Sequence, residues 1–371
     1  MTDGRVDAER SQSSWAKNAS VKLIDGVTVD SLDMWGATAG LPEQLQAAIA
    51  ASEPVRWHPP DDPIRHVVVV GTGGSGVVAD LVGAVGSKVM SVPVTAVSSG
   101  EIPVYVGPGS LVLAVSFSGD TLDTLSATKA AYDVGATVIT VTSGGQLAAL
   151  SEEHEGTMFV VPRTPPQSRV ALGALAATTF LALEELGLFG GAAEELQAAV
   201  EHLLWRRDEI FAAGGPADEV AARIGRTMPL VHGASGPAAV AARRWKTQFN
   251  LNAKTAAFWS SQPELCHDEI AGWGLGGDVT RQVLSVVTLR HDGERSDVSH
   301  RINFVNEVLR EVVADVIEVR TRGTRDLERF FDLAYFGDAV SLFLADREGI
   351  DSGPVPVLSE VELARDGCSP G

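Results

Sequence analysis

The sequence predicts an α/β protein built from two tandem domains, each a doubly wound parallel sheet. From residue 66 onward, short apolar and β-branched runs alternate with helix-like stretches. The runs are apolar on both sides, which is the pattern of strands in a parallel sheet that helices cover on both faces. Two segments, beginning near residues 66 and 228, open alike with a strand, a glycine turn and a helix, which indicates a duplicated fold.

The predicted segments follow one another in order. Residues 1–55 form a tail and a lead-in helix, 56–190 the first domain, 191–225 a helical linker and 226–371 the second domain. Strands of the first domain are expected at 67–70, 92–97, 111–115 and 137–141, with a helix at 121–133. The linker begins with a helix at 192–213, which two glycines and a proline end. Strands and helices of the second domain are expected from 228 and at 237–250, 283–289, 299–313, 315–320 and 332–346.

The composition excludes several classes of partner. The 371 residues are 45% hydrophobic and 21% charged, which is the profile of a globular protein with a large core. The formal net charge is −19 and the pI is about 4.8, so the chain offers no basic field to nucleic acid or to an anionic membrane. A small anionic ligand remains compatible, because backbone N–H groups and helix termini can hold a phosphate inside an acidic protein.

Cysteine usage and the apolar segments predict a cytoplasmic protein without a membrane span. The two cysteines, Cys266 and Cys368, lie far apart and support neither a disulfide framework nor a cysteine-based zinc site. The eight histidines show no metal-ligand spacing, so no metal is expected. Residues 1–20 are polar and mixed in charge, unlike a signal peptide. The apolar stretch at 170–188 contains two glutamates, and a buried helix accounts for it.

The turn from Gly71 to Gly76 reads GTGGSG, which satisfies the dinucleotide-binding pattern G-x-G-x-x-G between a strand and a helix. A nicotinamide enzyme would place an acidic residue at the end of the next strand to hold the ribose hydroxyls. Ser98 and Ser99 stand there instead, which disfavours a dinucleotide cofactor. A tight strand–helix turn without any ligand is the simpler alternative for this motif taken alone.

Three hydroxyl side chains follow the third strand of the first domain. The segment SFSGDT carries Ser116, Ser118 and Thr121 and leads directly into a helix. Ligands of open α/β sheets lie at these carboxyl ends, where hydroxyls and free N–H groups favour an anion. Helix capping would explain one hydroxyl, but not three beside Gly74 and Ser75 in the neighbouring turn. We call these five residues the phosphate cradle and predict that they bind a phosphate group.

The GGS turn and the SxSGxT loop together resemble a sugar isomerase (SIS) domain, which has a Rossmann-like, flavodoxin-like fold. The wider chain resembles the bifunctional phosphoglucose/phosphomannose isomerase family, whose members carry two such domains. This resemblance covers most of residues 30–365 and rests on motifs in a fixed order: SLDM at 31–34, LPEQL at 41–45, TSGG at 142–145, PPQSR at 165–169, RWK at 244–246 and PELCHDEI at 263–270. It implies a homodimer that binds a hexose 6-phosphate and needs neither a cofactor nor a metal.

The resemblance also assigns roles to single residues. In the family, the residues that match the cradle hold the phosphate of the sugar. The arginine that matches Arg169 lies beside the reacting carbons, where its guanidinium suits an enediolate oxyanion. The histidine that matches His267 assists ring opening and reaches the active site of the other subunit. The alternatives are a surface salt bridge for Arg169, which its motif disfavours slightly, and a structural role for His267.

Two positions depart from the family's catalytic pattern. The family's proton-transferring glutamate lies in an Asn-Glu-Asn segment, sixteen residues before the histidine, and Leu251 occupies that position here. Leucine accepts no proton, and loss of a general base costs about 10²–10⁴-fold in rate. Near the C-terminus, Glu362 aligns with the family's ring-opening lysine, which reverses the charge. Another carboxylate, Glu264, Asp268 or Glu269, could take over the role of the base.

The retained cradle and the altered proton-transfer positions predict a phosphosugar-binding protein that is impaired in catalysis. Such a protein would act as a hexose-phosphate sensor or regulator on a protein partner in sugar-phosphate metabolism. The alternative is an active aldose–ketose isomerase that interconverts glucose 6-phosphate, mannose 6-phosphate and fructose 6-phosphate through a cis-enediol. Arg169 and His267 favour the isomerase, whereas Leu251 and Glu362 favour the sensor.

Overall fold

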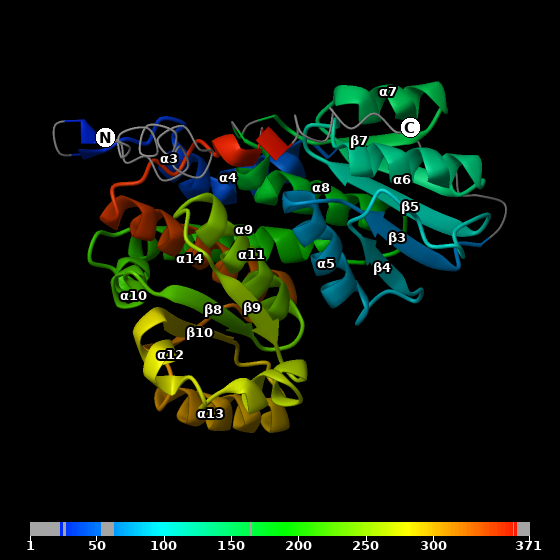
Figure 1. The fold of residues 1–371 in the computed structure, drawn as a ribbon. Coiled ribbons are helices and arrows are strands. Elements are labelled where there is room, and N and C mark those ends of the chain that lie inside the picture. Colours follow the sequence, from blue (N-terminus) through cyan, green and yellow to red (C-terminus); the bar gives the residue numbers. More distant parts are fainter. Residues whose placement is uncertain are drawn as a thin grey trace, which may run out of the picture.

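Two parallel sheets lie side by side, with helices around and between them (Figure 1). The computed structural model describes residues 23–24, 27–52, 63–163, 165, 167–358 and 360–361. The predicted fold class of two doubly wound α/β units is confirmed. Glu362, which the sequence placed at a catalytic position, lies outside the described residues.

The first sheet has five parallel strands in the order β4-β3-β5-β6-β7. They are β3 (His66–Val70), β4 (Val94–Val97), β5 (Ser110–Ser116), β6 (Thr137–Thr142) and β7 (Thr157–Val160). The chain changes direction across the sheet between β3 and β5, which opens a crevice at their carboxyl ends. Strand β7, which the sequence did not predict, is only partly buried at the edge of the sheet, so its apolar pattern is weak.

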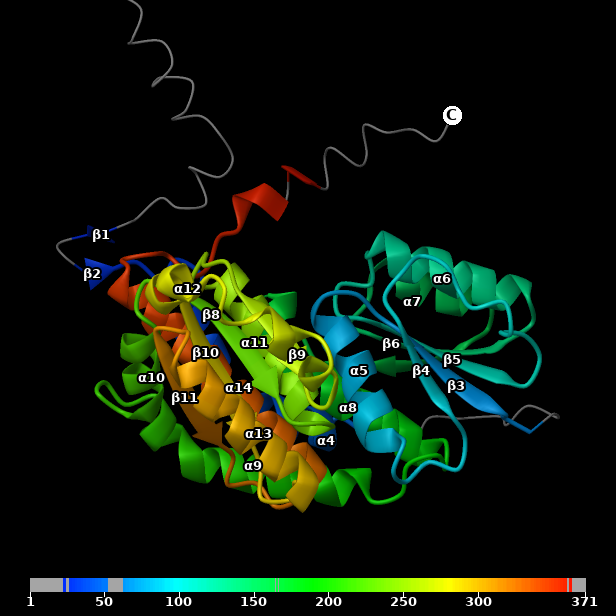
Figure 2. The same cartoon turned by 60° about the horizontal axis from the view of Figure 1, so that its bottom comes forward.

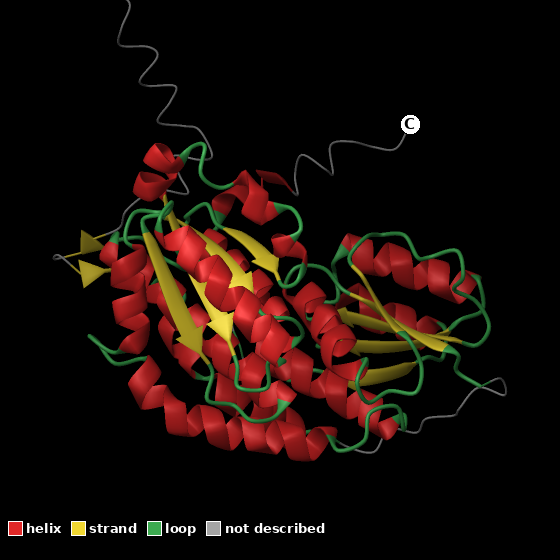
Figure 3. Cartoon of the chain, turned by 90° about the horizontal axis from the view of Figure 1, so that it is seen from below, coloured by secondary structure: helices red, strands yellow, loops and turns green. Residues whose placement is uncertain are grey.

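Helices cover both faces of this sheet, as Figure 3 shows. They are α5 (Gly74–Gly86), α6 (Leu122–Asp133), α7 (Gly145–Glu153) and α8 (Leu172–Glu185). Helix α8 accounts for the apolar stretch at 170–188, because nearly all of its side chains are buried in the core. In the part of the chain that the structure describes, no helix is long and apolar enough to cross a membrane.

The second sheet repeats this topology with four parallel strands in the order β11-β10-β8-β9. They are β8 (Met228–Gly233), β9 (Phe258–Ser261), β10 (Leu284–Arg290) and β11 (Asp315–Arg320). Its accompanying helices are α11 (Pro237–Leu251), α12 (Gly277–Val283) and α13 (Ser296–Arg310). The direction changes between β8 and β10, so a second crevice corresponds to the one in the first sheet.

The remaining helices pack around a long central helix. They are α3 (Met34–Ala39), α4 (Leu41–Ala50), α9 (Ala192–Ile210), α10 (Pro216–Ile224) and the central helix α14 (Asp326–Arg347). Helix α14 contacts α3, α9, α10 and α11. It starts six residues earlier than the sequence indicated, because the Glu328 side chain accepts the N–H group and the hydroxyl of Thr324 at its N-terminus. The domain boundaries given from the sequence stay a prediction.

Helix α11 packs against α14 through Trp245, whose indole ring lies so close to the α14 backbone that only glycine fits at position 337. Trp245 is fully buried, and its Nε1 donates a hydrogen bond of 2.7 Å to the carbonyl of Leu333. A Cβ atom on Gly337 would lie only 2.1 Å from Trp245 Nε1, so a larger residue there would push the helices apart. Next to it, buried Arg244 donates from Nε to Asp338 Oδ1 at 3.0 Å. The basic run at 243–246 is thus partly a buried contact with α14.

Helices α5 and α11 form the junction between the two sheets, and Figure 2 shows them side by side. Arg243 of α11 forms an ion pair with Asp80 of α5. A second ion pair joins Lys88, which follows α5, to Asp326 at the start of α14. Because α5 begins at the first crevice and α11 begins at the second, this junction fixes the two crevices relative to each other.

A buried carboxylate ties α14 to α9. Asp332 is 1% exposed, and its oxygens accept hydrogen bonds from Arg206 Nε at 3.1 Å and from Thr321 Oγ1 at 2.6 Å. His202 Nε2 lies 3.4 Å from the same carboxylate. Burial by itself raises the pKa of Asp332, but the interactions with His202, Arg206 and Thr321 lower it to about 2.

We expect Asp332→Asn to lower the free energy of unfolding by about 3 kcal/mol, because Arg206 then loses its buried partner. The folded-state pKa lies below the unfolded value of about 3.9, so this stabilisation is present above about pH 4 and is lost as the pH falls through about 2. In urea unfolding, the difference between wild type and variant should shrink over that range.

The matched control is Asp292→Asn, since this carboxylate is 80% exposed and pairs with Arg320 at the surface. It should change the free energy of unfolding by less than about 0.5 kcal/mol. Equal losses in the two variants, or a difference that persists at about pH 2, would contradict the role given to Asp332.

Candidate functional site

The predicted cradle lies at the carboxyl ends of β3 and β5. These strands are neighbours in the sheet, with Val70 opposite Ala114, so the turn that carries Ser75 and the loop that begins at Ser116 share one edge. Ser75 and Ser116 are both buried, with 7% and 2% of their surface exposed. Ser116 Oγ lies 3.2 Å from Thr121 Oγ1, and either hydroxyl could be the donor.

Helix capping does not account for the hydroxyls, although capping was the alternative explanation for them. Thr121 is the N-cap residue of α6, yet its side chain makes no capping hydrogen bond. Ser116 Oγ accepts the N–H of Gly119 at 3.1 Å, and Ser118 Oγ accepts the N–H of Asp120 at 3.2 Å. Because Ser116 and Thr121 share one hydrogen bond, one of these two hydroxyls and the hydroxyl of Ser118 keep a hydrogen to donate to a ligand, in addition to the free N–H groups at the start of α6.

The β6–α7 turn holds the hydroxyl loop in place. Gly119 has φ 76°, and a Cβ atom on it would lie 1.8 Å from the carbonyl oxygen of Gly144. The Ser143 hydroxyl donates to the carbonyl of Phe117, and Asp120 Oδ1 accepts the N–H of Gln146 at 3.0 Å. The TSGG motif at 142–145 thus supports the cradle from the neighbouring strand and does not have to contact a ligand.

Arg169 begins beside the cradle, but its guanidinium lies against the C-terminal segment. A Cβ atom on Gly74 would lie 4.0 Å from the Cα of Arg169, so the backbone of Arg169 adjoins the first turn of α5. Its Nη2 donates to the carbonyl of Ser352 at 2.7 Å and also to that of Gly353. Burial lowers the pKa of Arg169 to about 10, which the charge of Asp351 partly offsets.

The structure adds Lys254 and Asp351, which sequence reasoning missed. Lys254 Nζ donates to the carbonyl of Leu251 and lies 3.4 Å from that of Ser352, the same oxygen that Arg169 contacts. Burial, followed by repulsion from Arg169, lowers the pKa of Lys254 to about 8. Asp351 is 5% exposed, and its Oδ2 has no hydrogen-bond partner among the described residues. Lys254 closes the NLNAK segment at 250–254, which contains the altered position 251, whereas no sequence motif points to Asp351.

Leu251 is the last residue of α11, and its carbonyl oxygen accepts the hydrogen bond from Lys254. Through Lys254 and the carbonyl of Ser352, the end of α11 is joined to Arg169. Three parts of the chain that are distant in sequence therefore meet at the end of α11, and position 251 brings no carboxylate to them.

His267 lies apart from this group. It is exposed and directly follows a short 3₁₀ turn (Glu264–Cys266) after β9, and no described contact joins it to the cradle or to Arg169. Of the carboxylates proposed to replace the base, Glu269 is already engaged by His232, whose Nε2 lies 2.8 Å away, and by Ser260. Burial raises the pKa of Glu269, but these contacts lower it overall, so it is a poor proton acceptor. Asp268 accepts the N–H of Glu269 and caps a short turn.

The second crevice has the same backbone conformation before its helix as the first, but it lacks the hydroxyl side chains. Gly236 before α11 has φ 71° and ψ −132°, close to the φ 61° and ψ −123° of Gly73 before α5. At the end of β10 and in the loop after it, however, charged residues replace the hydroxyls, and Arg290, the last residue of β10, forms a buried ion pair of 2.7 Å with Glu294. Glu294 also accepts the N–H of His291. The protein's own carboxylate thus occupies the N–H group that an anion would need, and the first crevice is the better candidate.

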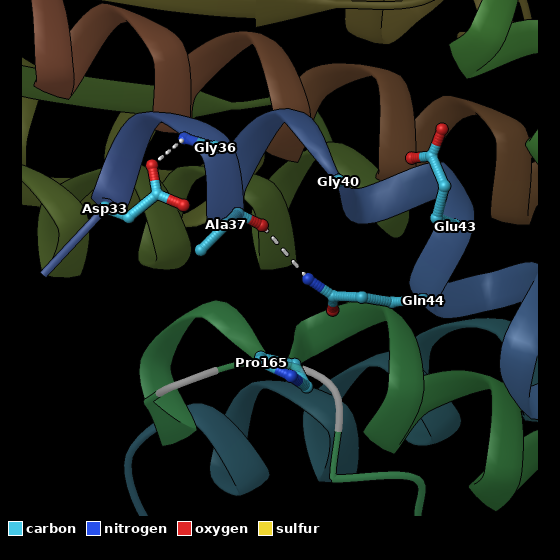
Figure 4. Close-up of a pocket in the computed structure, with 7 residues that line it drawn as sticks. All are labelled: Asp33, Gly36, Ala37, Gly40, Glu43, Gln44 and Pro165. Carbon is cyan, nitrogen blue, oxygen red and sulfur yellow. Dashed lines mark hydrogen bonds between the residues drawn. The ribbon is translucent and has the colours of Figure 1, made fainter.

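A separate pocket of about 270 Å³ lies between α3, α4 and Pro165 (Figure 4). Its charged lining consists of Asp33 and Glu43, and none of the predicted site residues lines it. Asp33 caps α3 by accepting the N–H of Gly36, and Gln44 donates to the carbonyl of Ala37 at 3.2 Å. Carboxylates disfavour a phosphate, so this pocket does not compete with the cradle. In the described ranges, no cluster of His, Cys, Asp or Glu side chains could hold a metal ion.

Curated relatives decide the family. Over 329 residues, the chain is 30% identical to a bifunctional phosphoglucose/phosphomannose isomerase of Caldicellulosiruptor bescii, covering 87% of this chain and 96% of that protein. An Aquifex aeolicus protein of the same name is 28% identical over 301 residues, covering 81% and 90%. The chain belongs to the bifunctional phosphoglucose/phosphomannose isomerase family. The resemblance that the motifs indicated is thereby confirmed.

Within this family, residues 214–362 match the model of the bacterial phospho-glucose isomerase C-terminal SIS domain. Tagatose-6-phosphate ketose/aldose isomerase from Escherichia coli superposes with a TM-score of 0.63 at 13% identity, covering 89% of this chain and 96% of that one. The C-terminal domain of glucosamine-fructose-6-phosphate aminotransferase from Francisella tularensis also gives 0.63, at 16% identity, with 86% and 96% covered. These structures share the SIS fold with this member of the isomerase family.

We expect Gly119→Ala to disrupt the hydroxyl loop, because its Cβ would overlap the Gly144 carbonyl. Gly135→Ala is the matched control, since its φ of 75° is nearly the same but its Cβ would approach Pro108 only to 3.7 Å. Left-handed strain alone costs about 1–2 kcal/mol, so Gly135→Ala should lose that amount in urea unfolding and Gly119→Ala clearly more. Equal losses would show that the close approach to Gly144 does not constrain the loop.

Proposed function

We propose that this chain binds a hexose 6-phosphate through the phosphate cradle and that it turns the sugar over poorly, acting as a sensor or regulator of hexose-phosphate metabolism. The contrast that carries this proposal is between a complete set of cradle hydroxyls, of which those of Ser75 and Ser116 are buried, and a leucine at position 251. Phosphate binding requires the hydroxyls, and proton transfer requires a base, which leucine does not supply.

The cradle suits a phosphate because its donors converge on one edge of the first sheet. The hydroxyls of Ser116 and Thr121 touch, and the N-termini of α5 and α6 are free of side-chain caps. Free N–H groups and the helix dipoles favour an anion there, even though the chain carries a net charge of −19. The relatives' names, which refer to phosphoglucose and phosphomannose, support a hexose as the sugar.

Weak turnover follows from the surroundings of Arg169. Aldose–ketose isomerisation moves a proton between neighbouring carbons and needs a base within hydrogen-bond reach. Leu251 supplies none, and the Arg169 guanidinium is bonded to the carbonyls of Ser352 and Gly353. A substrate would have to compete with these backbone carbonyls for the cation before the arginine could stabilise an enediolate.

A second candidate function is the active isomerase, which the family membership and the group around Arg169 favour. Asp351 is a buried carboxylate with an unpartnered oxygen, and its charge acts on both Arg169 and Lys254. A base that has moved from position 251 to Asp351 would restore the cis-enediol route between fructose 6-phosphate and the aldose 6-phosphates.

Homodimerisation and a cytoplasmic location are parts of this proposal. His267 is exposed and reaches no described residue of the predicted site, so a role in catalysis requires a second subunit. The edge strand β9, which precedes it, exposes Phe258 and Trp259 by 54% and 41%, as expected for a surface that a partner covers. Cys266 carries a free thiol, which agrees with a reducing compartment.

Removing the cradle hydroxyls should weaken sugar-phosphate binding. Ser116→Ala together with Thr121→Val should lower the affinity for fructose 6-phosphate by about tenfold or more, because each hydroxyl makes a charge-assisted hydrogen bond. Isothermal titration calorimetry measures this loss. Ser126→Ala, an exposed serine on α6 just beyond the cradle, is the control and should bind as the wild type does. Unchanged affinity in the double variant, with native stability, would place the phosphate elsewhere.

Leu251→Glu separates the two functions. If the missing base limits turnover, this variant should isomerise fructose 6-phosphate about 10²–10⁴-fold faster than the wild type. Leu251→Gln has a similar shape and accepts no proton, so it should stay at the wild-type rate. The measurement is the initial rate of glucose 6-phosphate and mannose 6-phosphate formation. A wild type that already turns over rapidly, with no gain in Leu251→Glu, would favour the active isomerase.

A further inference from the structure

Lys254 stands at an unusual place for a lysine. It follows α11 in a left-handed conformation with φ 54°, and this turns its side chain back so that Nζ donates to the carbonyl of Leu251. The side chain is half-buried, and among the described residues no carboxylate forms an ion pair with it. Lys88, by contrast, is 53% exposed and pairs with Asp326.

The surroundings of Lys254 increase the share of its neutral, nucleophilic form. From the segment before α8, the Arg169 cation acts on Lys254, and from the segment after α14, the Asp351 carboxylate opposes it. Burial is the largest effect and repulsion from Arg169 the second, and together they lower the pKa of Lys254 to about 8. A lysine that is desolvated and placed next to another cation is the usual form of an amine that attacks a carbonyl group.

A sugar held by its phosphate could reach this amine. The backbone of Arg169 adjoins the first turn of α5, where the cradle begins, and its guanidinium ends at the Ser352 carbonyl that Lys254 also approaches. The side chain of Arg169 and the carbonyl of Ser352 thus link the start of the cradle to the amine of Lys254. An open-chain hexose 6-phosphate carries its carbonyl group at C1 or C2, toward the end of the carbon chain opposite to the phosphate.

We infer that Lys254 forms an imine with the carbonyl carbon of an open-chain hexose 6-phosphate bound in the cradle. The amine lone pair forms the C–N bond, the carbonyl π bond opens onto oxygen, and one amine hydrogen moves to that oxygen. The resulting carbinolamine then loses water, which carries off the former carbonyl oxygen and both amine hydrogens. Arg169, whose Nε has no hydrogen-bond partner among the described residues, is placed to stabilise the oxygen while it is negative. This inference rests on the proposed sugar-phosphate binding.

The test is reductive trapping of the full chain. The protein is incubated with fructose 6-phosphate and cyanoborohydride, which reduces imines in preference to free carbonyl groups, then digested and analysed by peptide mass spectrometry. Lys254 should gain the mass of one hexose 6-phosphate less one oxygen atom. At about pH 8, it should be labelled about tenfold or more faster than Lys88 or Lys129, since an ordinary lysine has a pKa near 10.4. Its labelling should level off above about pH 8–9, whereas ordinary surface lysines keep rising.

Variants and a second ligand make the test specific. Lys254→Arg keeps the cation and its hydrogen bonds but has no amine that can form the imine, so it should bind the sugar and lose the adduct. Sorbitol 6-phosphate, which lacks a carbonyl group, should protect Lys254 from labelling. Ser116→Ala with Thr121→Val should also reduce labelling of Lys254 while leaving Lys88 and Lys129 unchanged.

The outcomes separate this inference from the proposed function. In one outcome, calorimetry shows that fructose 6-phosphate binds, but the lysines are labelled only according to their exposure. This would overturn the role of Lys254 and leave the binding proposal standing. Labelling of Lys254 that sorbitol 6-phosphate does not reduce would also overturn it, because the amine would then react without the site. Absence of both binding and labelling would overturn the proposed function itself.

Discussion

The packing of Trp245 against Gly337 fixes the central helix α14 to α11, and the position of the candidate site depends on it. Only the absence of a side chain at Gly337 lets the indole lie against the helix backbone, where it bonds the Leu333 carbonyl. The neighbouring Arg244–Asp338 pair is buried, so shifting one helix along the other would strand a charge. With this contact in place, the end of α11 and the segment that follows α14 are held close together.

That arrangement brings Arg169, Lys254 and Asp351 to one small volume. The Ser352 carbonyl accepts from both cations, which joins the segment before α8, the end of α11 and the segment after α14. Two cations and one carboxylate leave this place positively charged within an acidic protein. Burial lowers the pKa of both Arg169 and Lys254. These lowered pKa values decide which of the two groups can give up a proton.

Duplication of the fold has not duplicated the chemistry. Both sheets change direction at equivalent points, and both helices after the first strand begin at a glycine in the same unusual conformation. In the first domain, Ser116 and Ser118 each accept one N–H group of their own loop, and the N-termini of α5 and α6 carry no side-chain cap. In the second, Glu294 accepts one such N–H group and neutralises Arg290, which serves the stability of that domain. The first crevice is therefore the better candidate for binding an anion, because in the second the protein's own carboxylate accepts an N–H group.

The sequence by itself determined the fold class and the family, and it predicted the residues of the cradle. Apolar strand runs, glycine turns and the SxSGxT loop are local patterns, and local patterns survive in a single sequence. Edge strands β7 and β9 escaped prediction because they are only partly buried and their apolar periodicity is weak. Only the tertiary structure decided that Lys254 and Asp351 lie beside Arg169, and that the Arg169 guanidinium faces backbone carbonyls. The hydrogen bonds join positions 169 and 254 to the carbonyl of residue 352. These positions are distant in sequence and meet only because α11 packs against α14, so no spacing along the chain could predict the contact.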